Sequence, residues 1–436
     1  MISGDTIAAI ATAPGRGGVA IVRVSGPEAF AIAERLTGCA PAVDQAVFSR
    51  FSSYSSDSSP ARKSIIDTGL LLAFNSPRSY TGEDVVEFQC HGGAVTPRRV
   101  LEACLAAGAR LARRGEFTER AFLNGKLDYG QAESVLDLVD AKTSRAADAA
   151  LEGLSGCRRR ALRTLYETAL DLSVRLEHAL DIDEGELPDD FLPSIHSSLL
   201  TLHSSLRAAI SKAAEGRLLK SGALVVLAGP PNAGKSSLMN ALLETNRAIV
   251  SDVPGTTRDS IEEWVDLAGW PIRLTDTAGL RETKDEVEVE GVKRAEDLIM
   301  RADVVVWLST PSSLFPRPSS LLIHPKCDLG RGEGLNVSAK TGEGLEELKR
   351  AIVAKLEEKV GRTDSGEAPE GDVVALREAL ALLGGGRETR DMRREEELVL
   401  LANSVRAAAE RLGTAVGATY SADMLDNLFS RFCVGK

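Results

Sequence analysis

Aromatic residues are scarce in this chain of 436 residues, and long apolar runs are absent. Aromatic side chains make up 4% of the sequence and hydrophobic residues 43%, which is enough for real cores, and the abundant alanine and leucine favour helices. No stretch approaches the roughly 18 apolar residues of a membrane-spanning helix, so we expect no membrane segment. The N-terminus lacks a basic region followed by an apolar block, so we expect no secretory signal.

Paired cysteines are also missing from the sequence. The six cysteines are scattered without any C-x-x-C pair: Cys39, Cys90, Cys104, Cys157, Cys327 and Cys433. Dispersed thiols of this kind indicate a reducing compartment, so we expect a cytoplasmic protein without a disulfide framework or zinc site. The net charge of −11 opposes non-specific binding of nucleic acid by the whole surface, although a local basic face remains open.

The length predicts two or three domains. In residues 1–117, short apolar runs and two helix patterns predict an α+β domain, with a polar connection over residues 49–63. Apolar residues recur at helical spacing over 118–219 and 361–436, which predicts an all-α domain in two parts. Residues 220–360 alternate strand and helix patterns. We therefore expect a multidomain α/β protein in which a domain with a mixed, mostly parallel sheet is inserted into the helical domain.

Residues 229–236 read Gly-Pro-Pro-Asn-Ala-Gly-Lys-Ser and lie between an apolar run at 223–228 and a helix pattern at 237–243. This order is typical of a P-loop, because the glycines let backbone N–H groups converge on a phosphate at a helix N-terminus. The Lys235 ammonium can reach the outer phosphates, and the Ser236 hydroxyl suits Mg²⁺. The loop residues expected to contact GTP are Asn232, Ala233, Gly234, Lys235, Ser236 and Ser237.

Three further motifs follow predicted strands. In the motif at 276–279, the Asp276 carboxylate would face the metal and the Gly279 N–H would sense the γ-phosphate. In the motif at 326–328, Lys326 precedes Asp328, whose carboxylate can accept hydrogen bonds from both N1–H and N2–H of guanine, a pattern that adenine does not offer. The last motif consists of Ser338, Ala339 and Lys340. Four motifs in this order predict a Ras-like P-loop GTPase domain.

Motifs outside the GTPase segment carry a family resemblance. They lie at residues 5–7 (Asp-Thr-Ile), 13–18 (Ala-Pro-Gly-Arg-Gly-Gly), 80–84 (Tyr-Thr-Gly-Glu-Asp), 91–93 (His-Gly-Gly), 115–126, 131–133 (Gln-Ala-Glu) and 432–436 (Phe-Cys-Val-Gly-Lys). With these motifs the chain resembles, over nearly its whole length, the MnmE (TrmE) family of tRNA-modifying GTPases. The terminal cysteine motif separates that family from other GTPases with a similar P-loop.

The resemblance implies a specific architecture and activity. Residues 1–117 would bind 5-formyltetrahydrofolate or a related tetrahydrofolate and form a homodimer, and residues 220–360 would be the GTPase domain inserted between helical parts at 118–219 and 361–436. A heterotetramer with the flavoprotein MnmG (GidA) would add an aminomethyl or carboxymethylaminomethyl group to C5 of the wobble uridine (position 34) in certain tRNAs. GTP, Mg²⁺ and K⁺ would be required, and no membrane would be involved.

The resemblance also implies the folate contacts, which are Arg23, Glu87, Lys126 and the terminal Lys436. The side-chain types suit folate, because Arg23 and Lys126 could pair with its glutamate carboxylates and Glu87 could accept from the pterin N–H groups. From the residues alone, each could equally be a surface or sheet-face charge. Cys433 is placed beside the folate by the resemblance. Its thiol then either takes part in the modification chemistry or packs as an ordinary free cysteine.

The GTPase lacks the glutamine that orients water in many relatives of Ras, since Leu280 holds that region. Glu282 is the nearest candidate for orienting water and the resemblance supports it, although a charged loop residue is the plain alternative. The sequence contains no obvious arginine finger. The resemblance instead implies a K⁺ bound by Asn232 and by Ser251, Val253 and Thr256. It also implies that Ser251, Thr256 and Thr257 bind GTP and that Thr257 joins Ser236 on Mg²⁺.

The guanine motif departs from the usual pattern at Pro325, where asparagine or threonine normally stands. Proline offers neither a backbone N–H nor a polar side chain, so we expect guanine specificity through Asp328 but a lower affinity.

The sequence alone is compatible with three functions. A GTP-hydrolysing tRNA-modification enzyme leads. A non-catalytic GTP-dependent switch, such as a ribosome-assembly factor, would share the GTPase motifs, and a folate-dependent one-carbon transferase with a regulatory GTPase insert is the third. The N-terminal motifs and the terminal cysteine favour the first, because a simple switch needs neither.

Overall fold

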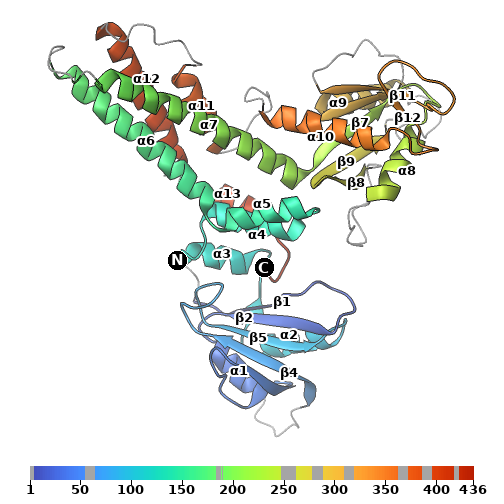
Figure 1. Ribbon diagram of the computed structural model, residues 1–436. Helices are drawn as coiled ribbons and strands as arrows, with labels where there is room; N and C mark the ends of the chain where they lie inside the picture. Colours follow the sequence, from blue (N-terminus) through green and yellow to red (C-terminus); the bar gives the residue numbers. More distant parts are fainter. Residues whose placement is uncertain are drawn as a thin grey trace. The chain divides into compact units, whose positions relative to one another are not determined.

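The computed structural model describes residues 4–54, 64–182, 188, 190–246, 262–276, 288–308, 319–361, 372–384, 395–416 and 422–436. The chain divides into two compact units (Figure 1). The N-terminal unit consists of Met1–Leu136 and Thr419–Lys436, and the second unit consists of Asp137–Ala418. Within the described ranges, no helix is long and apolar enough to cross a membrane.

The N-terminal unit contains a six-stranded sheet in the order β3-β4-β5-β2-β1-β6, drawn in blue in Figure 1. Its strands are β1 (Ile7–Ile10), β2 (Val19–Ser25), β3 (Ala46–Ser52), β4 (Ile65–Phe74), β5 (Val85–His91) and β6 (Arg110–Leu111). Neighbouring strands are antiparallel except β1 and β6. The predicted connection over 49–63 was wrong for its first residues, since β3 continues to Ser52.

Two helices cover one face of this sheet. Helices α1 (Ala29–Thr37) and α2 (Thr96–Ala106) share a core with alternate residues of β2 and β5, including Val22 and Phe88. The intervening residues Arg23 and Glu87 therefore point to the opposite face, because successive side chains of a strand alternate. This alternation places two predicted folate contacts side by side on paired strands.

Three more helices belong wholly or partly to the N-terminal unit: α3 (Glu116–Leu123), α4 (Tyr129–Asp140) and α13 (Ala422–Ser430). The buried residues of α4 and α13, among them Leu136 and Leu428, form a small core with Phe432 of the chain's last residues. The C-terminal segment is therefore part of the core of the N-terminal unit.

The second unit has a helical layer built from α5 (Ser144–Leu154), α6 (Cys157–Leu180), α7 (Phe191–Ser221), α11 (Asp372–Leu382) and α12 (Glu395–Val416). The core lies between α6, α7, α11 and α12 and is aliphatic, with Leu172, Leu202 and Val405 at its centre. Helices before and after the sheet segment share this core, as the helical periodicity predicted.

The second unit also has a six-stranded sheet in the order β12-β11-β10-β7-β9-β8. Its strands are β7 (Ala223–Ala228), β8 (Glu262–Leu267), β9 (Trp270–Asp276), β10 (Val304–Leu308), β11 (Ser320–Pro325) and β12 (Leu335–Val337). Its helices are α8 (Lys235–Asn246), α9 (Glu288–Arg301) and α10 (Leu345–Gly361). Only the β8–β9 pair is antiparallel, so the prediction of a mixed, mostly parallel sheet is confirmed.

Strand β7 determines where a ligand can bind in this sheet. All six of its residues are buried, as expected of a central parallel strand. The chain continues from β7 to β8 and β9 on one side and later to β10, β11 and β12 on the other. In open α/β sheets, ligands bind at the carboxyl end of the strand where this reversal occurs. The predicted P-loop begins there.

Candidate functional site

The loop after β7 has the backbone geometry of a phosphate cradle. Gly229 has φ of 152°, and a Cβ on it would lie 2.6 Å from the carbonyl oxygen of Leu308. Gly234 has φ of 97°, and Asn232 also lies in the left-handed region at 61°. Helix α8 begins at Lys235, so backbone N–H groups and the positive end of the helix dipole meet at this loop.

Lys235 lies inside this loop. The residue is 5% exposed, and its Nζ donates hydrogen bonds to the carbonyl oxygens of Gly229 at 3.0 Å and Pro230 at 2.9 Å. An ammonium group held within the loop can neutralise phosphate charge there.

The Ser236 hydroxyl donates a hydrogen bond of 2.7 Å to Oδ2 of Asp276. These oxygens come from the first turn of α8 and the end of β9, two separate predicted motifs that the fold brings together. A hydroxyl and a buried carboxylate beside a phosphate loop are the hard oxygen donors that Mg²⁺ prefers, so the residues present fit this ion.

The two loops expected to bind guanine lie side by side, because β11 and β12 are paired and Pro325 is opposite Val337. The Ser338 hydroxyl donates a hydrogen bond of 2.7 Å to Oδ1 of Asp328. This bond lowers the pKa of Asp328 below its ordinary value, so the carboxylate stays ionised and able to accept from guanine N–H groups. Ser338 itself is buried and holds the turn that follows, since its carbonyl accepts from the N–H of Gly342.

A hydrogen bond joins the guanine motif to the phosphate loop. The Nζ of Lys326 donates to the carbonyl oxygen of Asn232 at 3.0 Å, and Lys326 has φ of 57°. The motifs at 229–236, 276 and 326–340 therefore form one site at the carboxyl ends of β7, β9, β11 and β12.

Several predicted residues lie outside the described residues: Ser251, Val253, Thr256, Thr257, Gly279, Leu280 and Glu282. Their expected roles on K⁺, Mg²⁺, the γ-phosphate and the attacking water stay predictions.

In the N-terminal unit, the predicted folate contacts Arg23 and Glu87 bind each other. The Nε of Arg23 donates to Oε1 of Glu87 at 2.8 Å. The Arg23 guanidinium also lies 5.6 Å from the ring centroids of both Tyr80 and Phe117. Arg23 is thus held by one carboxylate and two aromatic rings on the sheet face opposite α1 and α2.

Tyr80 is a site residue that sequence reading missed, although it opens the family-like motif at 80–84. Its hydroxyl is bonded to that of Thr118 at 2.9 Å. Burial raises the pKa of Tyr80, so its phenol stays protonated at neutral pH.

The other predicted folate contacts belong to the same unit. Lys126 donates from Nζ to the carbonyl oxygen of Pro77 at 3.1 Å. The C-terminal segment lies against β1, where a Cβ on Gly435 would be 2.2 Å from the carbonyl oxygen of Ile10. The Cys433 carbonyl accepts from the N–H groups of Gly115 and Lys436, and the Cys433 side chain is exposed.

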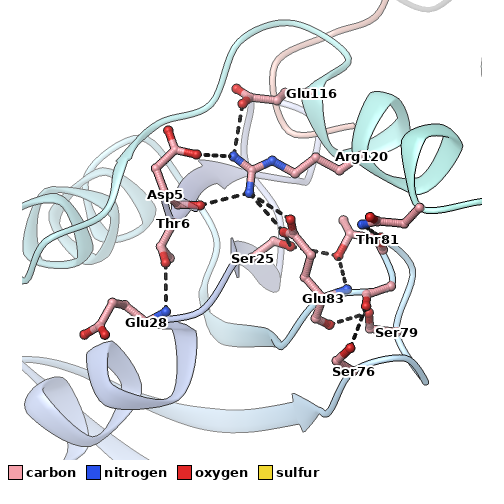
Figure 2. A network of polar contacts seen from close by, with 12 residues as sticks. Asp5, Thr6, Ser25, Glu28, Ser76, Ser79, Thr81, Glu83, Glu116 and Arg120 are labelled. Atoms are coloured by element: carbon pink, nitrogen blue, oxygen red, sulfur yellow. Dashed lines mark hydrogen bonds and ion pairs between the residues drawn. The ribbon is translucent and has the colours of Figure 1, made fainter. Parts of the chain in front are cut away.

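A second feature missed by sequence reading is a network of buried charges around Arg120 (Figure 2). It connects Asp5, Glu83 and Glu116, residues far apart in the sequence. The motifs at 5–7, 80–84 and 115–126 marked its members in advance, without indicating that they meet.

The sheet order and the converging loops define a P-loop GTP-binding domain, carried in one chain with a separate α+β unit. Residues 6–126 match the family model described as the GTP-binding protein TrmE N-terminus, and residues 130–433 match the model described as the MnmE helical domain. The chain therefore belongs to the MnmE family of tRNA modification GTPases.

Curated relatives extend this assignment to the whole chain. The tRNA modification GTPase MnmE of Nitrosomonas europaea is 40% identical, with 100% of each chain covered. The protein of the same name from Stutzerimonas stutzeri is 41% identical, with 99% of each covered. Among solved structures, the G domain of the T. maritima FeoB iron transporter matches with 29% identity and a TM-score of 0.23, covering 30% of this chain and 98% of that one.

Proposed function

We propose that this chain hydrolyses GTP to drive modification of tRNA, and that the product carries an aminomethyl or carboxymethylaminomethyl group at C5 of the wobble uridine. The flavoprotein MnmG (GidA) would be its partner, and a tetrahydrofolate would supply the one-carbon unit. The observation that supports this most is the joint presence of a GTP site and a separate Arg23–Glu87 site in a chain with full-length MnmE relatives.

The proposed organisation assigns folate binding and dimerisation to residues 1–117. Residues 118–219 and 361–436 would form the helical domain, and residues 220–360 the inserted GTPase domain. A homodimer that joins MnmG as a heterotetramer, in the cytoplasm, completes the proposal.

In GTP hydrolysis, Lys235 would neutralise charge on the outer phosphates, and Ser236, Thr257 and Asp276 would hold Mg²⁺. Bound Mg²⁺ supplies positive charge that stabilises the phosphates as the bond to the γ-phosphate breaks. Gly279 would contact the γ-phosphate, and Glu282 would orient the attacking water in place of the missing glutamine.

K⁺ would serve where other GTPases use an arginine finger. Asn232 would bind it together with Ser251, Val253 and Thr256. The position of Asn232 at the turn of the phosphate loop, with its own backbone fixed by Lys326, supports this assignment.

Folate would bind on the face of the N-terminal sheet opposite α1 and α2, beside Tyr80 and Phe117. The Arg23–Glu87 bond uses only Nε of a guanidinium that has four more N–H donors, so Arg23 can bind a carboxylate while remaining paired. Lys126 and Lys436 would add positive charge. Because Glu87 pairs with Arg23 at 2.8 Å, it would contact the same end of the ligand as Arg23 and not the pterin at the other end. The exposed Cys433 thiol is accessible for the modification chemistry.

The proposal is tested by mass spectrometry of tRNA nucleosides from a strain that lacks this chain, with and without its reintroduction. We expect the C5 group of wobble uridines to disappear without the chain and to return with it. Unchanged wobble uridines in the deletion strain, accompanied by an altered ribosomal-subunit profile, would instead identify the chain as a ribosome-assembly switch.

A further inference from the structure

Arg120 is the centre of a buried ionic network in the N-terminal unit (Figure 2). Its side chain is 4% exposed and pairs with three carboxylates: with Oδ1 of Asp5 at 2.8 Å, with Oε2 of Glu83 at 3.0 Å and with Oε1 of Glu116 at 3.3 Å. A buried network of this kind is not a general source of stability, because charges pay a large desolvation penalty that apolar side chains do not. It does favour one arrangement of the segments that it joins.

Glu83 connects this network to the loop at residues 76–84. The Glu83 carboxylate also accepts from the Ser25 hydroxyl at 2.8 Å, at the end of β2. Ser25 in turn bonds the hydroxyl of Thr81, which accepts from the N–H of Glu83. Asn124 of the segment after α3 donates to the carbonyl of Thr81 at 2.7 Å. The loop is therefore fixed on one side to β2 and on the other to α3 and the residues that follow it.

The same loop contacts two of the predicted folate ligands. Its Tyr80 ring lies against the Arg23 guanidinium, and its Pro77 carbonyl accepts from Nζ of Lys126. A Cβ on Gly82 would lie 3.3 Å from Cγ of Lys126, so the loop also touches the stem of that side chain. The two cations that suit the glutamate carboxylates of folate are thus both held by residues 76–84.

We propose that Arg120, acting through Glu83, is a positioning residue for the folate site. The pair fixes the loop at 76–84, and the loop sets the directions of the Arg23 and Lys126 charges toward the glutamate tail of the ligand. Arg120 does not touch the ligand. This role rests on the proposed folate binding.

The experiment compares the affinities of the full-length protein for 5-formyltetrahydrofolate and for its dimethyl ester, measured by calorimetry. The two ligands differ only in the tail, where esterification removes both negative charges and adds two methyl groups. The ratio of their affinities does not depend on the folded fraction, so a merely structural role of the network would leave it unchanged.

The test variant is Glu83→Gln, and the matched control is Asp5→Asn. Both substitutions remove one carboxylate from Arg120, but the Asp5 carboxylate pairs with Arg110 and Arg120, whereas that of Glu83 lies in the loop itself and also accepts from Ser25. We expect the parent and Asp5→Asn to prefer the free acid at least tenfold, and Glu83→Gln to prefer it less than threefold. If Glu83→Gln does not fold, Ser25→Ala, which keeps every charge, should reduce the preference to an intermediate value.

Two results would contradict different parts of the account. A parent protein that binds neither ligand would overturn the folate site itself. A parent that prefers the free acid, with the same preference retained in Glu83→Gln or Ser25→Ala, would overturn the role of Arg120 and leave the folate site standing. An equal loss in Asp5→Asn would also overturn it, because that variant keeps Glu83 together with its bonds to Arg120 and Ser25.

Discussion

Glu116 illustrates at the scale of one residue how the N-terminal unit holds buried charge. Its side chain is 2% exposed. Burial alone would raise its pKa, but hydrogen bonds from Arg110 and from the N–H of Arg113, with the charges of Arg110 and Arg120, lower the pKa from 4.5 to about 2. A carboxyl with a lowered pKa stabilises the folded state above its unfolded pKa, and this contribution is lost as the pH falls toward the folded value.

Glu116 should therefore make the stability of the N-terminal unit depend on pH. At neutral pH the shift corresponds to at most roughly 3 kcal/mol of stability, which should disappear between pH 4.5 and about 2 in the parent. Glu116→Gln should lack this part of the pH dependence. The measurement is the labelling rate of the buried Cys104 by a disulfide reagent that reacts in acid, located by peptide mass spectrometry. Parallel pH profiles for parent and variant would contradict the assignment.

Pro325 is the residue through which the guanine loop departs from the usual motif. Pro325→Asn should tighten GDP binding by roughly 1 kcal/mol, about fivefold, if its side chain gains one neutral hydrogen bond near the phosphate loop. The neighbouring Lys326 already donates a hydrogen bond to Asn232 of that loop, so a side chain at position 325 has only a short distance to reach it. Calorimetry with GDP checks this, and an unchanged or weaker affinity would refute it.

Asn232 carries the prediction about K⁺. GTP hydrolysis should be faster in K⁺ than in Na⁺ at equal ionic strength, because the smaller Na⁺ fits the same oxygens poorly. Asn232→Ala should remove most of that difference. The backbone of Asn232 adopts φ of 61°, which asparagine tolerates better than alanine, so Asn232→Gly is the control for backbone strain. Equal rates of the parent in both salts would end the proposal of a K⁺ site.

At the scale of elements, the hairpin of β8 and β9 is attached to the start of α5. The Thr143 hydroxyl donates to the carbonyl oxygen of Gly269 at 2.7 Å, and the Arg145 guanidinium lies 4.2 Å from the ring centroid of Trp270. Arg145 also pairs with Glu215 of α7. Since β9 ends at Asp276, the same hairpin joins the helical layer to a proposed Mg²⁺ ligand.

Loss of the Arg145 contact should therefore lower the free energy of unfolding. Arg145→Ala should cost about 0.5–1 kcal/mol through the lost cation–π contact. Arg145→Lys keeps the positive charge that pairs with Glu215 but loses the planar stacking on the ring. Its free energy of unfolding should therefore lie between those of the parent and Arg145→Ala. Urea unfolding followed by tryptophan fluorescence tests it, since all three tryptophans lie in the second unit. Identical midpoints for the parent and both variants would show that the contact contributes nothing.

The same scale shows what the sequence could predict. Strand β7 and the helices α6 and α7 were found because continuous apolar runs and helical spacing reflect burial directly. The strand β3 was partly missed because it is an edge strand in which only Phe51 is buried, so its serines and Arg50 read as a connection.

Local motifs likewise located the GTP site, whose loops each follow a strand. The setting of Arg23 between Tyr80 and Phe117, and the pairing of Arg120 with Asp5, escaped sequence reading. The latter two residues are separated by 115 positions, and nothing local in either segment marks their contact. Such contacts arise only when the fold brings distant segments together.

At the scale of the whole molecule, each unit carries its own candidate site, and the chain's last residues pack into the N-terminal unit. Phe432 is buried at 2%, Val434 bridges to Arg114, and Gly435 lies against β1. Removing residues 432–436 would therefore disturb this core as well as remove Cys433. Replacing Cys433 alone by serine is the cleaner probe of its chemistry, because its side chain is exposed.

We propose that GTP bound at the Asp328 site drives tRNA modification. Asn in place of Asp328 would offer an N–H donor to the C2 carbonyl of xanthine, whereas the parent carboxylate accepts from guanine N–H groups. In the measurement, purified protein is added to a desalted extract of a strain lacking this chain. The C5-modified wobble uridine is then quantified by mass spectrometry. We expect the parent and the surface control Asp148→Asn to support the modification with GTP only. Asp328→Asn should support it with XTP only. Modification by Asp328→Asn with GTP at the parent level, or modification by the parent without any nucleoside triphosphate, would contradict the account.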